Sequence, residues 1–232
     1  REGGRHPGPI AYRFLRDGTL YTDAGRTPGG PEMLARLRER KIPHRFVTNT
    51  TSRPRRLLVE RLRGYGYEIG REEIQTPVTA ALTIARARGY RVLAPFVPET
   101  VLEEMGGLAL RGGTAGTSPS SQAPDAVIIG DLGQVWTFDR MQEAFEYLMR
   151  GADLLALSRD RYFLSSRGLT LDAGPFVAAL EYATGKTATV AGKPSTEFFR
   201  TAVSGLELPA DADPAQIAMV GDDLCSDVEG AQ

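Results

Sequence analysis

The chain has 232 residues, of which 28 are basic and 29 acidic, so its formal net charge is −1. A chain of this length buries roughly 70–75% of its unfolded surface, and we expect a soluble enzyme of one or two domains. The balanced charge provides no broad field for nucleic acid, and no apolar run approaches the ~20 residues of a membrane span. The single cysteine, Cys225, excludes an internal disulfide and favours a reducing cytoplasm.

The first part of the chain is predicted to alternate between strands and helices. The strands are short apolar runs that end at polar turns, and the helices carry apolar residues on one face. The predicted elements are strands at residues 10–15 and 44–47 and helices at residues 31–40 and 54–62. This order and spacing are typical of a parallel α/β sheet.

A second α/β unit is predicted at about residues 89–187. Its expected strands lie at residues 91–97, 126–130 and 153–157, its helices at 100–105, 140–150 and 175–182, and a Gly/Ser/Thr-rich loop at 111–123. The strand at residues 189–191 is expected to return to the main sheet. Residues 1–88 and 188–232 would then form one domain and residues 89–187 the other.

Two short polar motifs follow the first two strands. Asp17 stands in an Asp-Gly turn, a pair that is common for reasons of turn geometry alone. Thr48 and Asn49 follow the strand at residues 44–47, so their side chains would point into the cleft where α/β sheets bind ligands. Such groups hold phosphoryl oxygens well, but Thr and Asn also cap helices, and a helix follows soon after. Each motif is weak by itself.

A lysine follows the predicted strand at residues 189–191. Lys193 lies between Gly192 and Pro194, in a chain with only two other lysines, Lys41 and Lys186. A lysine at a strand end can neutralise a phosphoryl group and nearby carboxylates. The alternative is that Lys193 is a solvated surface charge, as isolated lysines usually are.

The strongest motif is the acidic run that follows the apolar strand at residues 217–220. Three carboxylates stand within six residues of each other: Asp222, Asp223 and Asp227. Clustered oxygen ligands of this kind suit Mg²⁺. The alternative is an acid-rich helix N-terminus, which explains three carboxylates behind a buried strand less well.

Basic side chains are also frequent between residues 53 and 63. We interpret them as a solvated helix face rather than a nucleic-acid patch: Arg53, Arg55, Arg56, Arg61 and Arg63.

The four motifs, in this order, resemble those of the haloacid dehalogenase (HAD) phosphatases. The stretch at residues 174–194 is similar to subclass IIA, including the HAD-like hydrolase domain-containing proteins and the phospholysine phosphohistidine inorganic pyrophosphate phosphatases. The resemblance covers nearly the whole chain, from about residue 14 to 232. It implies an α/β fold with an HAD-like Rossmannoid parallel-sheet core, residues 1–88 and 188–232, and an inserted large α/β cap, residues 89–187.

The resemblance also implies Mg²⁺-dependent hydrolysis of a small phosphorylated substrate, either a phosphomonoester, a phosphoamide or pyrophosphate. In the family a first aspartate attacks phosphorus and a second, which Asp17 matches, protonates the leaving group and then activates water. By this resemblance, the substrate-binding positions are Thr48, Asn49 and Lys193, and Lys193 is also a catalytic residue. The implied metal site contains Asp17, Asp222, Asp223 and Asp227, of which Asp223 and Asp227 also support the other ligands and the lysine. Relatives are often dimeric through the cap, and residues 159–167 are a candidate cap loop over the cleft.

Two features depart from the family pattern. Leu15 occupies the position of the nucleophile, and leucine neither attacks phosphorus nor binds a metal. The strand around it contains Arg13 and Arg16 after an Arg/Gly/Pro-rich start, which favours a shifted reading frame or a mis-assigned gene start before Asp17. The family pattern also continues beyond Gln232, so a C-terminal strand and helix are expected to be missing.

The predicted function is therefore an HAD-type phosphatase whose activity is impaired by Leu15. Two alternatives stay open. One is a non-catalytic relative that binds phosphorylated ligands through Thr48, Asn49 and Lys193, and the other is a non-functional fragment.

Overall fold

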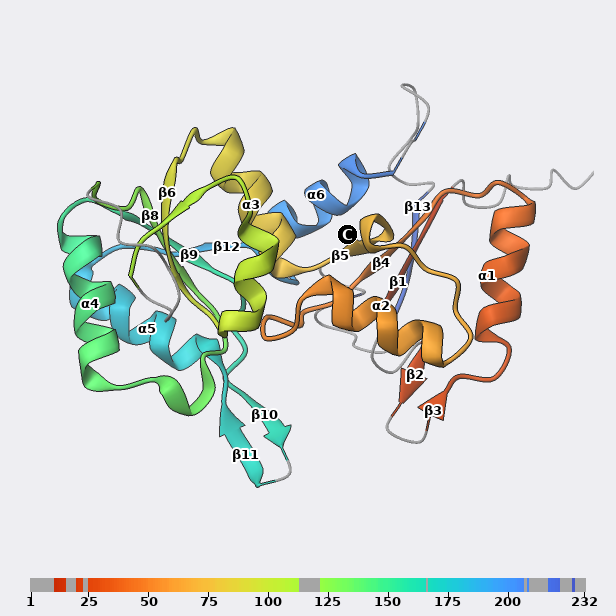
Figure 1. The fold of residues 1–232 in the computed structure, drawn as a ribbon, viewed down its shortest axis with the longest axis horizontal. Helices are drawn as coiled ribbons and strands as arrows, with labels where there is room; N and C mark the ends of the chain where they lie inside the picture. Colours follow the sequence, from red (N-terminus) through yellow and green to blue (C-terminus); the bar gives the residue numbers. More distant parts are fainter. Residues whose placement is uncertain are drawn as a thin grey trace, which may run out of the picture.

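Two parallel sheets, which lie side by side in Figure 1, organise the chain. The computed structural model describes residues 11–15, 20–22, 25–112, 122–165, 167–206, 208, 217–221 and 227, and for residues 11–15 and 22 it describes the backbone only. One sheet has four strands in the order β13-β1-β4-β5, and the other has five in the order β12-β9-β8-β6-β7. The predicted α/β fold with parallel sheets is confirmed.

The four-stranded sheet has β1 at its centre. β1 (Ala11–Leu15) pairs in parallel with β4 (His44–Val47) and with β13 (Ile217–Val220), and β5 (Ile74–Gln75) extends the sheet beyond β4. The register places Leu15 opposite Val47 and Phe14 opposite Val220. The residues that follow these three strands therefore leave the sheet at one shared edge.

Two helices cover one face of this sheet. α1 (Gly30–Glu39) and α2 (Arg55–Gly64) bury leucines against Phe46 and Ile74. The short ribbon of β2 (Tyr21–Thr22) and β3 (Gly25–Arg26) packs at their side, where the Tyr67 hydroxyl donates to the carbonyl oxygen of Leu20 at 2.6 Å. A 3-10 turn, η1 (Arg71–Glu73), leads into β5.

The five-stranded sheet is buried on both faces. β6 (Val92–Phe96), β8 (Ala126–Ile129) and β9 (Asp153–Ala156) are its inner strands, with β7 (Ala109–Leu110) and β12 (Thr189–Val190) at the edges. Alternate residues of each inner strand belong to different apolar clusters, as the period of two in a strand requires. α4 (Phe138–Met149), after the 3-10 turn η3 (Gly133–Val135), and α5 (Ala173–Thr184) cover one face.

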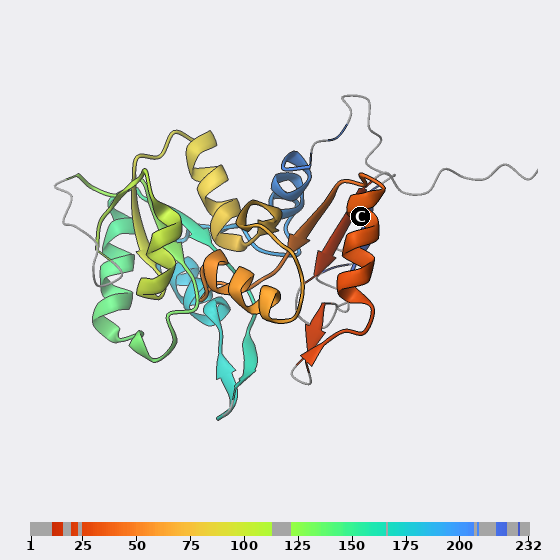
Figure 2. The same ribbon diagram turned by 45° about the vertical axis from the view of Figure 1, so that its right-hand side comes forward.

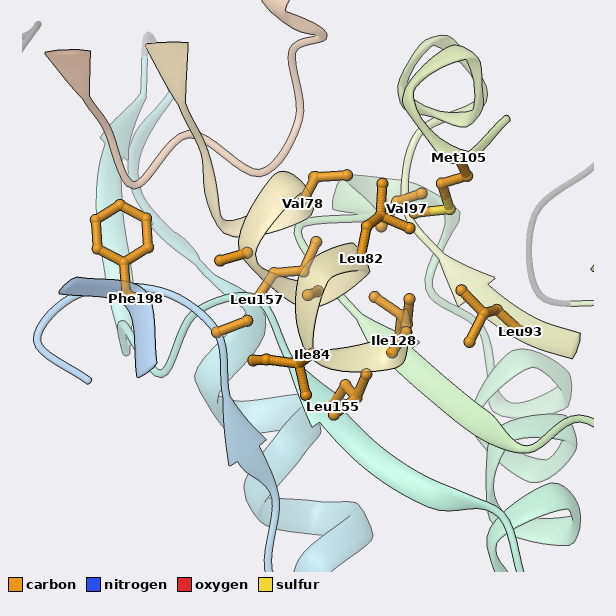
Figure 3. Packing of buried hydrophobic residues seen from close by; sticks show 14 of the residues in the cluster. Val78, Leu82, Ile84, Leu93, Val97, Met105, Ile128, Leu155, Leu157 and Phe198 are labelled. Carbon is orange, nitrogen blue, oxygen red and sulfur yellow. The ribbon is translucent and has the colours of Figure 1, made fainter. Parts of the chain in front are cut away.

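The other face packs against α3 (Pro77–Ala87). Figure 3 shows Val78, Leu82 and Ile84 of this helix against Ile128 and Leu155 of the sheet. α6 (Thr196–Ser204) packs beside α3 and contributes Phe198 to the same cluster, which also contains Val47 of β4. One apolar cluster therefore joins the two sheets.

A hairpin projects from the molecule in Figures 1 and 2. β10 (Tyr162–Ser165) and β11 (Gly168–Leu171) pair only with each other among the described residues. Leu164 and Leu169 face each other across it and are 79% and 72% exposed.

Several expectations are corrected by this fold. β12 joins the five-stranded sheet beside β9 rather than the main sheet, because α5 packs on that sheet and Val190 stays in the same apolar cluster. The expected helix at residues 100–105 is the 3-10 helix η2 (Glu99–Met105), and the expected loop at residues 159–167 contains strand β10. α3 and α6 were not predicted. Most of the loop at residues 111–123 lies outside the described residues, and the division into domains at residues 88 and 188 stays a prediction.

Candidate active site

The carboxyl edge of the four-stranded sheet collects the predicted motifs. Leu15 ends β1, Thr48 follows β4 and Gly221 follows β13, and β1 lies between the other two strands. Parallel strands release their chains at the same edge, which is where open α/β sheets bind ligands. The strand order alone therefore brings the chain at Leu15, Thr48 and Gly221 to one edge of the sheet.

Asn49 ties this edge to the chain around Lys193. Its side-chain Oδ1 accepts a hydrogen bond from the Lys193 backbone N–H at 2.8 Å, and its Nδ2 donates to the Lys193 carbonyl oxygen at 3.2 Å. The two contacts fix the Lys193 backbone although Asn49 lies 144 residues earlier in the sequence. Gly192 is required here, because a Cβ at that position would overlap the carbonyl oxygen of Leu157 and approach Asn49.

Lys193 and Asp227 form a buried ion pair. The Lys193 Nζ donates to the Asp227 Oδ1 at 2.7 Å, and the two side chains are only 4% and 1% exposed. Lys193 is therefore not the solvated surface charge that was the alternative. A buried charge is stable only when it is paired, so each of these residues depends on the other.

Thr48 is buried at the same edge. Its backbone N–H donates to the carbonyl oxygen of Gln75 at 3.1 Å, and its hydroxyl lies 3.2 Å from the hydroxyl of Thr50. The residue before α2 is Pro54, and neither Thr48 nor Asn49 caps that helix. The helix-cap interpretation of this motif is wrong, and both residues lie at the carboxyl edge of the four-stranded sheet.

Three aspartates on segments that connect to the five-stranded sheet lie near the same region. The Asn49 Nδ2 lies 3.4 Å from an Asp160 carboxylate oxygen, and the Thr51 hydroxyl accepts a hydrogen bond from the Asp131 backbone N–H at 3.2 Å. Burial raises the pKa of Asp172 to about 6, against the hydrogen bond from the Ala173 N–H, and the charges of Asp160 and Asp131 add to the increase. These three aspartates therefore lie near one another at the carboxyl end of the second sheet.

Part of the predicted site lies outside the described residues: Asp17, Asp222, Asp223 and the side chain of Leu15. Of the two roles implied for Asp227, metal ligand and support for the lysine, its contact is with the lysine. Within the described ranges, no three His, Cys, Asp or Glu side chains are grouped so as to hold a metal ion. By sequence, the acidic run begins directly after β13, the strand that pairs with β1, and carboxylate oxygens are ligands that Mg²⁺ prefers.

Asp131, Asp160 and Asp172 were missed by the sequence reasoning. Asp160 stands within the segment at residues 159–167, which was expected to lie over the cleft, and its contact with Asn49 agrees with that placement. Asp131 follows the strongly apolar strand β8 after one glycine, so the rule that ligands bind at strand ends could have found it. Asp172 precedes α5 and accepts from the Ala173 N–H, a position where an aspartate is usually only a helix cap.

Known proteins match this chain along most of its length. The sequence profile of the haloacid dehalogenase-like hydrolases matches residues 15–108, and that of the HAD-hydrolase-like proteins matches residues 190–232. The mouse (Mus musculus) haloacid dehalogenase-like hydrolase domain-containing protein 2 is 38% identical over 216 residues, which are 93% of this chain and 77% of that protein. The human (Homo sapiens) phospholysine phosphohistidine inorganic pyrophosphate phosphatase is 35% identical over 206 residues, 88% of this chain and 70% of that protein.

A solved structure matches the fold. The p-nitrophenyl phosphatase from Archaeoglobus fulgidus superposes with a TM-score of 0.81 at 27% identity and covers 97% of this chain and 83% of its own. The resemblance stated from the motifs is thereby confirmed. Within the part of the chain that the structure describes, no helix is long and apolar enough to cross a membrane.

Proposed function

Because this chain belongs to the haloacid dehalogenase-like hydrolase family, we propose that it carries the centre of a Mg²⁺-dependent phosphatase whose turnover is blocked at Leu15. The substrate class is a small phosphorylated compound: a phosphomonoester, a phosphoamide or pyrophosphate. A cytoplasmic setting, which the single cysteine favours, belongs to the same proposal.

The buried Lys193–Asp227 ion pair is the observation that carries this proposal. Burying a lysine is costly, and a structural role alone would be served as well by apolar side chains of similar volume. Here the lysine is held by Asn49 at the strand edge that also receives Thr48 and residue 15. A fixed ammonium at that edge is suited to neutralising a phosphoryl group.

The residues around Lys193 supply the remaining polar groups. The Thr48 hydroxyl would bind a phosphoryl oxygen, and Asp17 would protonate the leaving oxygen and then deprotonate the attacking water. Asp17 and Asp222 would hold Mg²⁺, with Asp223 and Asp227 in support, and the bound ion would offset the negative charge of the phosphoryl group.

Leu15 removes the nucleophile from this arrangement. Covalent phosphoryl transfer needs a carboxylate at residue 15, and removal of a covalent nucleophile in a well-studied hydrolase lowers kcat by about 10⁶. The chain with Leu15 is therefore expected to show almost no turnover. A carboxylate restored at this position would attack phosphorus and expel the leaving oxygen, and water would then release inorganic phosphate.

The test is Leu15→Asp, assayed with Mg²⁺ on p-nitrophenyl phosphate and on a panel of phosphoamides and pyrophosphate. We expect a rate at least about 10⁴ above that of the unmodified chain, lost again on chelation. Leu15→Asn is the matched control, because it has nearly the same shape and polarity and no nucleophilic carboxylate. A folded Leu15→Asp chain that is as inactive as Leu15→Asn on the whole panel would contradict the proposal.

A second candidate function is binding of phosphorylated ligands without catalysis. It is favoured by the arrangement of Thr48, Asn49 and Lys193, whose described hydrogen bonds are with one another, with Thr50 and with Asp227. Saturable binding of a phosphate ester by the unmodified chain in the absence of Mg²⁺, together with inactivity of Leu15→Asp, would favour this function over the first.

The three aspartates opposite the site bear on the substrate. A phosphoamide of a basic side chain has a cationic leaving group, and the carboxylates of Asp131, Asp160 and Asp172 would attract it. In the Leu15→Asp chain we expect Asp160→Asn to lower kcat/KM for phospholysine more than for p-nitrophenyl phosphate. Equal losses on both substrates would exclude this preference.

The proposal includes a homodimer formed through the cap. The apolar hairpin of β10 and β11 exposes Leu164, Leu169 and Leu171, a surface that a second copy would cover. Leu164→Ser should convert a dimer to a monomer in light scattering, whereas Lys41→Gln on the remote α1 side should not. A monomeric unmodified chain at high concentration would exclude this part of the proposal.

A further inference from the structure

A polar cavity of about 320 Å³ lies away from the candidate active site, between β4, α3 and α6. Arginines from three elements line it: Arg45 of β4, Arg55 of α2 and Arg86 of α3. Glu104 of η2 is the only acidic residue among its described lining. The cavity shares none of its lining with Thr48, Asn49, Lys193 or Asp227, and it carries an excess of positive charge.

Arg45 is a half-buried guanidinium without a carboxylate partner among the described residues. Its Nη1 donates to the Gly205 carbonyl oxygen at 2.8 Å and its Nη2 to the Gln75 Oε1 at 3.3 Å, and both acceptors are neutral. Its Nε is buried and has no hydrogen-bond partner. Burial lowers the pKa of Arg45, and the neighbouring charge of Arg55 lowers it further. An anion in this cavity would relieve both effects.

Glu104 does not provide that anion, because two other arginines already engage it. The Arg55 backbone N–H and Nε each donate to it at 2.8 Å, and the Arg71 Nη2 lies 3.1 Å from the same carboxylate. The Glu104 side chain is almost completely buried in this network. One carboxylate is thus shared by two guanidiniums, and among the described residues no carboxylate pairs with Arg45 or with the exposed Arg86.

The hydroxyl groups around the cavity are already used as donors. Thr79, Thr83, Thr201 and Ser204 each donate to a backbone carbonyl oxygen of their own helix or of its N-cap residue. The guanidinium N–H groups are therefore the donors left for a ligand. Such a donor set selects a charged oxyanion over a neutral sugar or alcohol, because guanidinium pairs with phosphate and carboxylate oxygens through charge-assisted hydrogen bonds.

We propose that this cavity is a binding site for a small oxyanion of the phosphate class, separate from the candidate active site. Arg45, in β4, would bind the anion from the side of the sheet, and Arg86, in α3, would bind it from the exposed side of the cavity. A cavity of about 790 Å³ adjoins the site and shares Arg45, Arg55 and Gly205, so an organic group attached to the phosphate has space.

The site is linked to the active-site edge through Gln75. The Gln75 side chain accepts from Arg45 and donates to the Thr201 hydroxyl at 2.9 Å, while its backbone carbonyl accepts from the Thr48 N–H at 3.1 Å. An anion that attracts Arg45 thus acts on the residue that positions Thr48. This proposal does not depend on catalysis by the chain.

The test is titration of the full chain with inorganic phosphate in the presence of EDTA, followed by calorimetry. We expect saturable binding that Arg45→Gln weakens about tenfold or more. Arg86→Gln should weaken it in the same direction. Arg200→Gln is the matched control, because it removes the same charge from an exposed helix position outside the cavity, and binding should stay within about twofold of the unmodified chain.

Phosphate also fits the candidate active site, so the readout is the difference between the variants. Binding at Lys193 alone would be insensitive to Arg45→Gln and Arg86→Gln, and that result would overturn the proposal. Absence of saturable binding by the unmodified chain at millimolar phosphate would overturn it as well. Arg86 is exposed on α3, so its variant keeps the test valid even if Arg45→Gln does not fold.

Discussion

The two sheets of this molecule differ in what their strands contain. β8 of the five-stranded sheet reads Ala-Val-Ile-Ile and is buried throughout, whereas β4 of the four-stranded sheet reads His-Arg-Phe-Val and is buried only over its second half. The apolar side chains of β8 require only that neighbouring side chains of suitable volume and shape pack against them. Each polar residue of β4 needs a particular partner, which His44 finds in Glu73 and Arg45 finds in Gln75.

The difference shows how the molecule separates stability from chemistry. The five-stranded sheet is a packed support, and the candidate site residues at its end lie on connecting segments rather than in its strands. The four-stranded sheet carries polar and charged groups in and after its strands, and the buried Asp227, which follows β13, is paired with Lys193, which follows β12 of the other sheet. Substitutions should therefore act through lost partners in one sheet and through lost volume in the other.

The largest expected loss of stability follows from breaking the buried pair. Lys193→Gln leaves the Asp227 carboxylate buried without its cation, which costs about 3–5 kcal/mol of the free energy of unfolding. Urea unfolding at pH 7 measures it. Lys41→Gln, at an exposed lysine, should change the same free energy by less than about 0.5 kcal/mol. Equal small effects of the two variants would show that the pair is not buried.

In the five-stranded sheet, the loss of buried side-chain volume should determine how much a substitution lowers stability. Ile128→Ala removes a fully buried side chain of β8 and should cost about 2–4 kcal/mol, while Val135→Ala at an exposed position should cost little. Ile128→Val should cost about 1 kcal/mol. If Ile128→Ala is as mild as Val135→Ala in urea unfolding, the sheet is not the packed support described above.

Protonation of Glu73 is expected to cause a pH-dependent loss of folding stability. Burial raises its pKa, but hydrogen bonds from His44, the Gly70 N–H and Arg38 outweigh burial and lower the pKa to about 2. The folded state thus binds the proton less tightly than the unfolded state, and the stabilisation is present above about pH 4.5 and lost as pH falls towards 2.

Glu73→Gln should therefore destabilise the chain at pH 7 by about 1 kcal/mol, after allowance for solvent screening of this partly exposed group. The difference from the unmodified chain should shrink below about pH 4. Unfolding free energies across this range give the result, and a pH-independent difference would mean that packing rather than charge is lost.

The smallest expected change is a gain, rather than a loss, in the free energy of unfolding. The pKa of Asp172 is raised to about 6, so its ionisation disfavours the folded state as pH rises from about 4 to above 6. Asp172→Asn keeps a helix-capping side chain and should stabilise the chain at pH 7 by up to about 1 kcal/mol, with no gain near pH 4. Thermal unfolding at the two pH values measures it, and destabilisation at pH 7 would contradict the assigned environment.

The sequence predicted the elements that have a strong local signal. The apolar runs of β6, β8 and β9 and the apolar stripes of α1, α2 and α4 identify those elements without further information. β12 and the β10–β11 hairpin carry weaker signals, because two residues or an exposed strand show no clear periodicity. Their pairing is decided by packing against α5 and by the hairpin's own register.

The candidate site was predictable where a motif follows a strand. Thr48, Asn49 and Lys193 were found in this way, and their contacts across the fold agree with it. Arg45 was not singled out, although an arginine inside a short strand is itself a signal that a polar cavity adjoins it. Arg55 was interpreted as part of a solvated helix face. That interpretation is wrong for this residue, because its guanidinium pairs with the buried carboxylate of Glu104, which lies on another segment, η2. Sequence spacing holds no information on such a pairing.

The most direct test of the central claim is to locate the phosphoryl group on the protein. The Leu15→Asp chain would be mixed with p-nitrophenyl phosphate and Mg²⁺, quenched rapidly in acid and digested, and its peptides weighed. We expect one phosphoryl group, labile to hydroxylamine, on the aspartate introduced at residue 15, and none in Leu15→Asn. Hydrolysis by Leu15→Asp with the phosphoryl group on another residue would show that the carboxyl end of β1 is not the reacting centre.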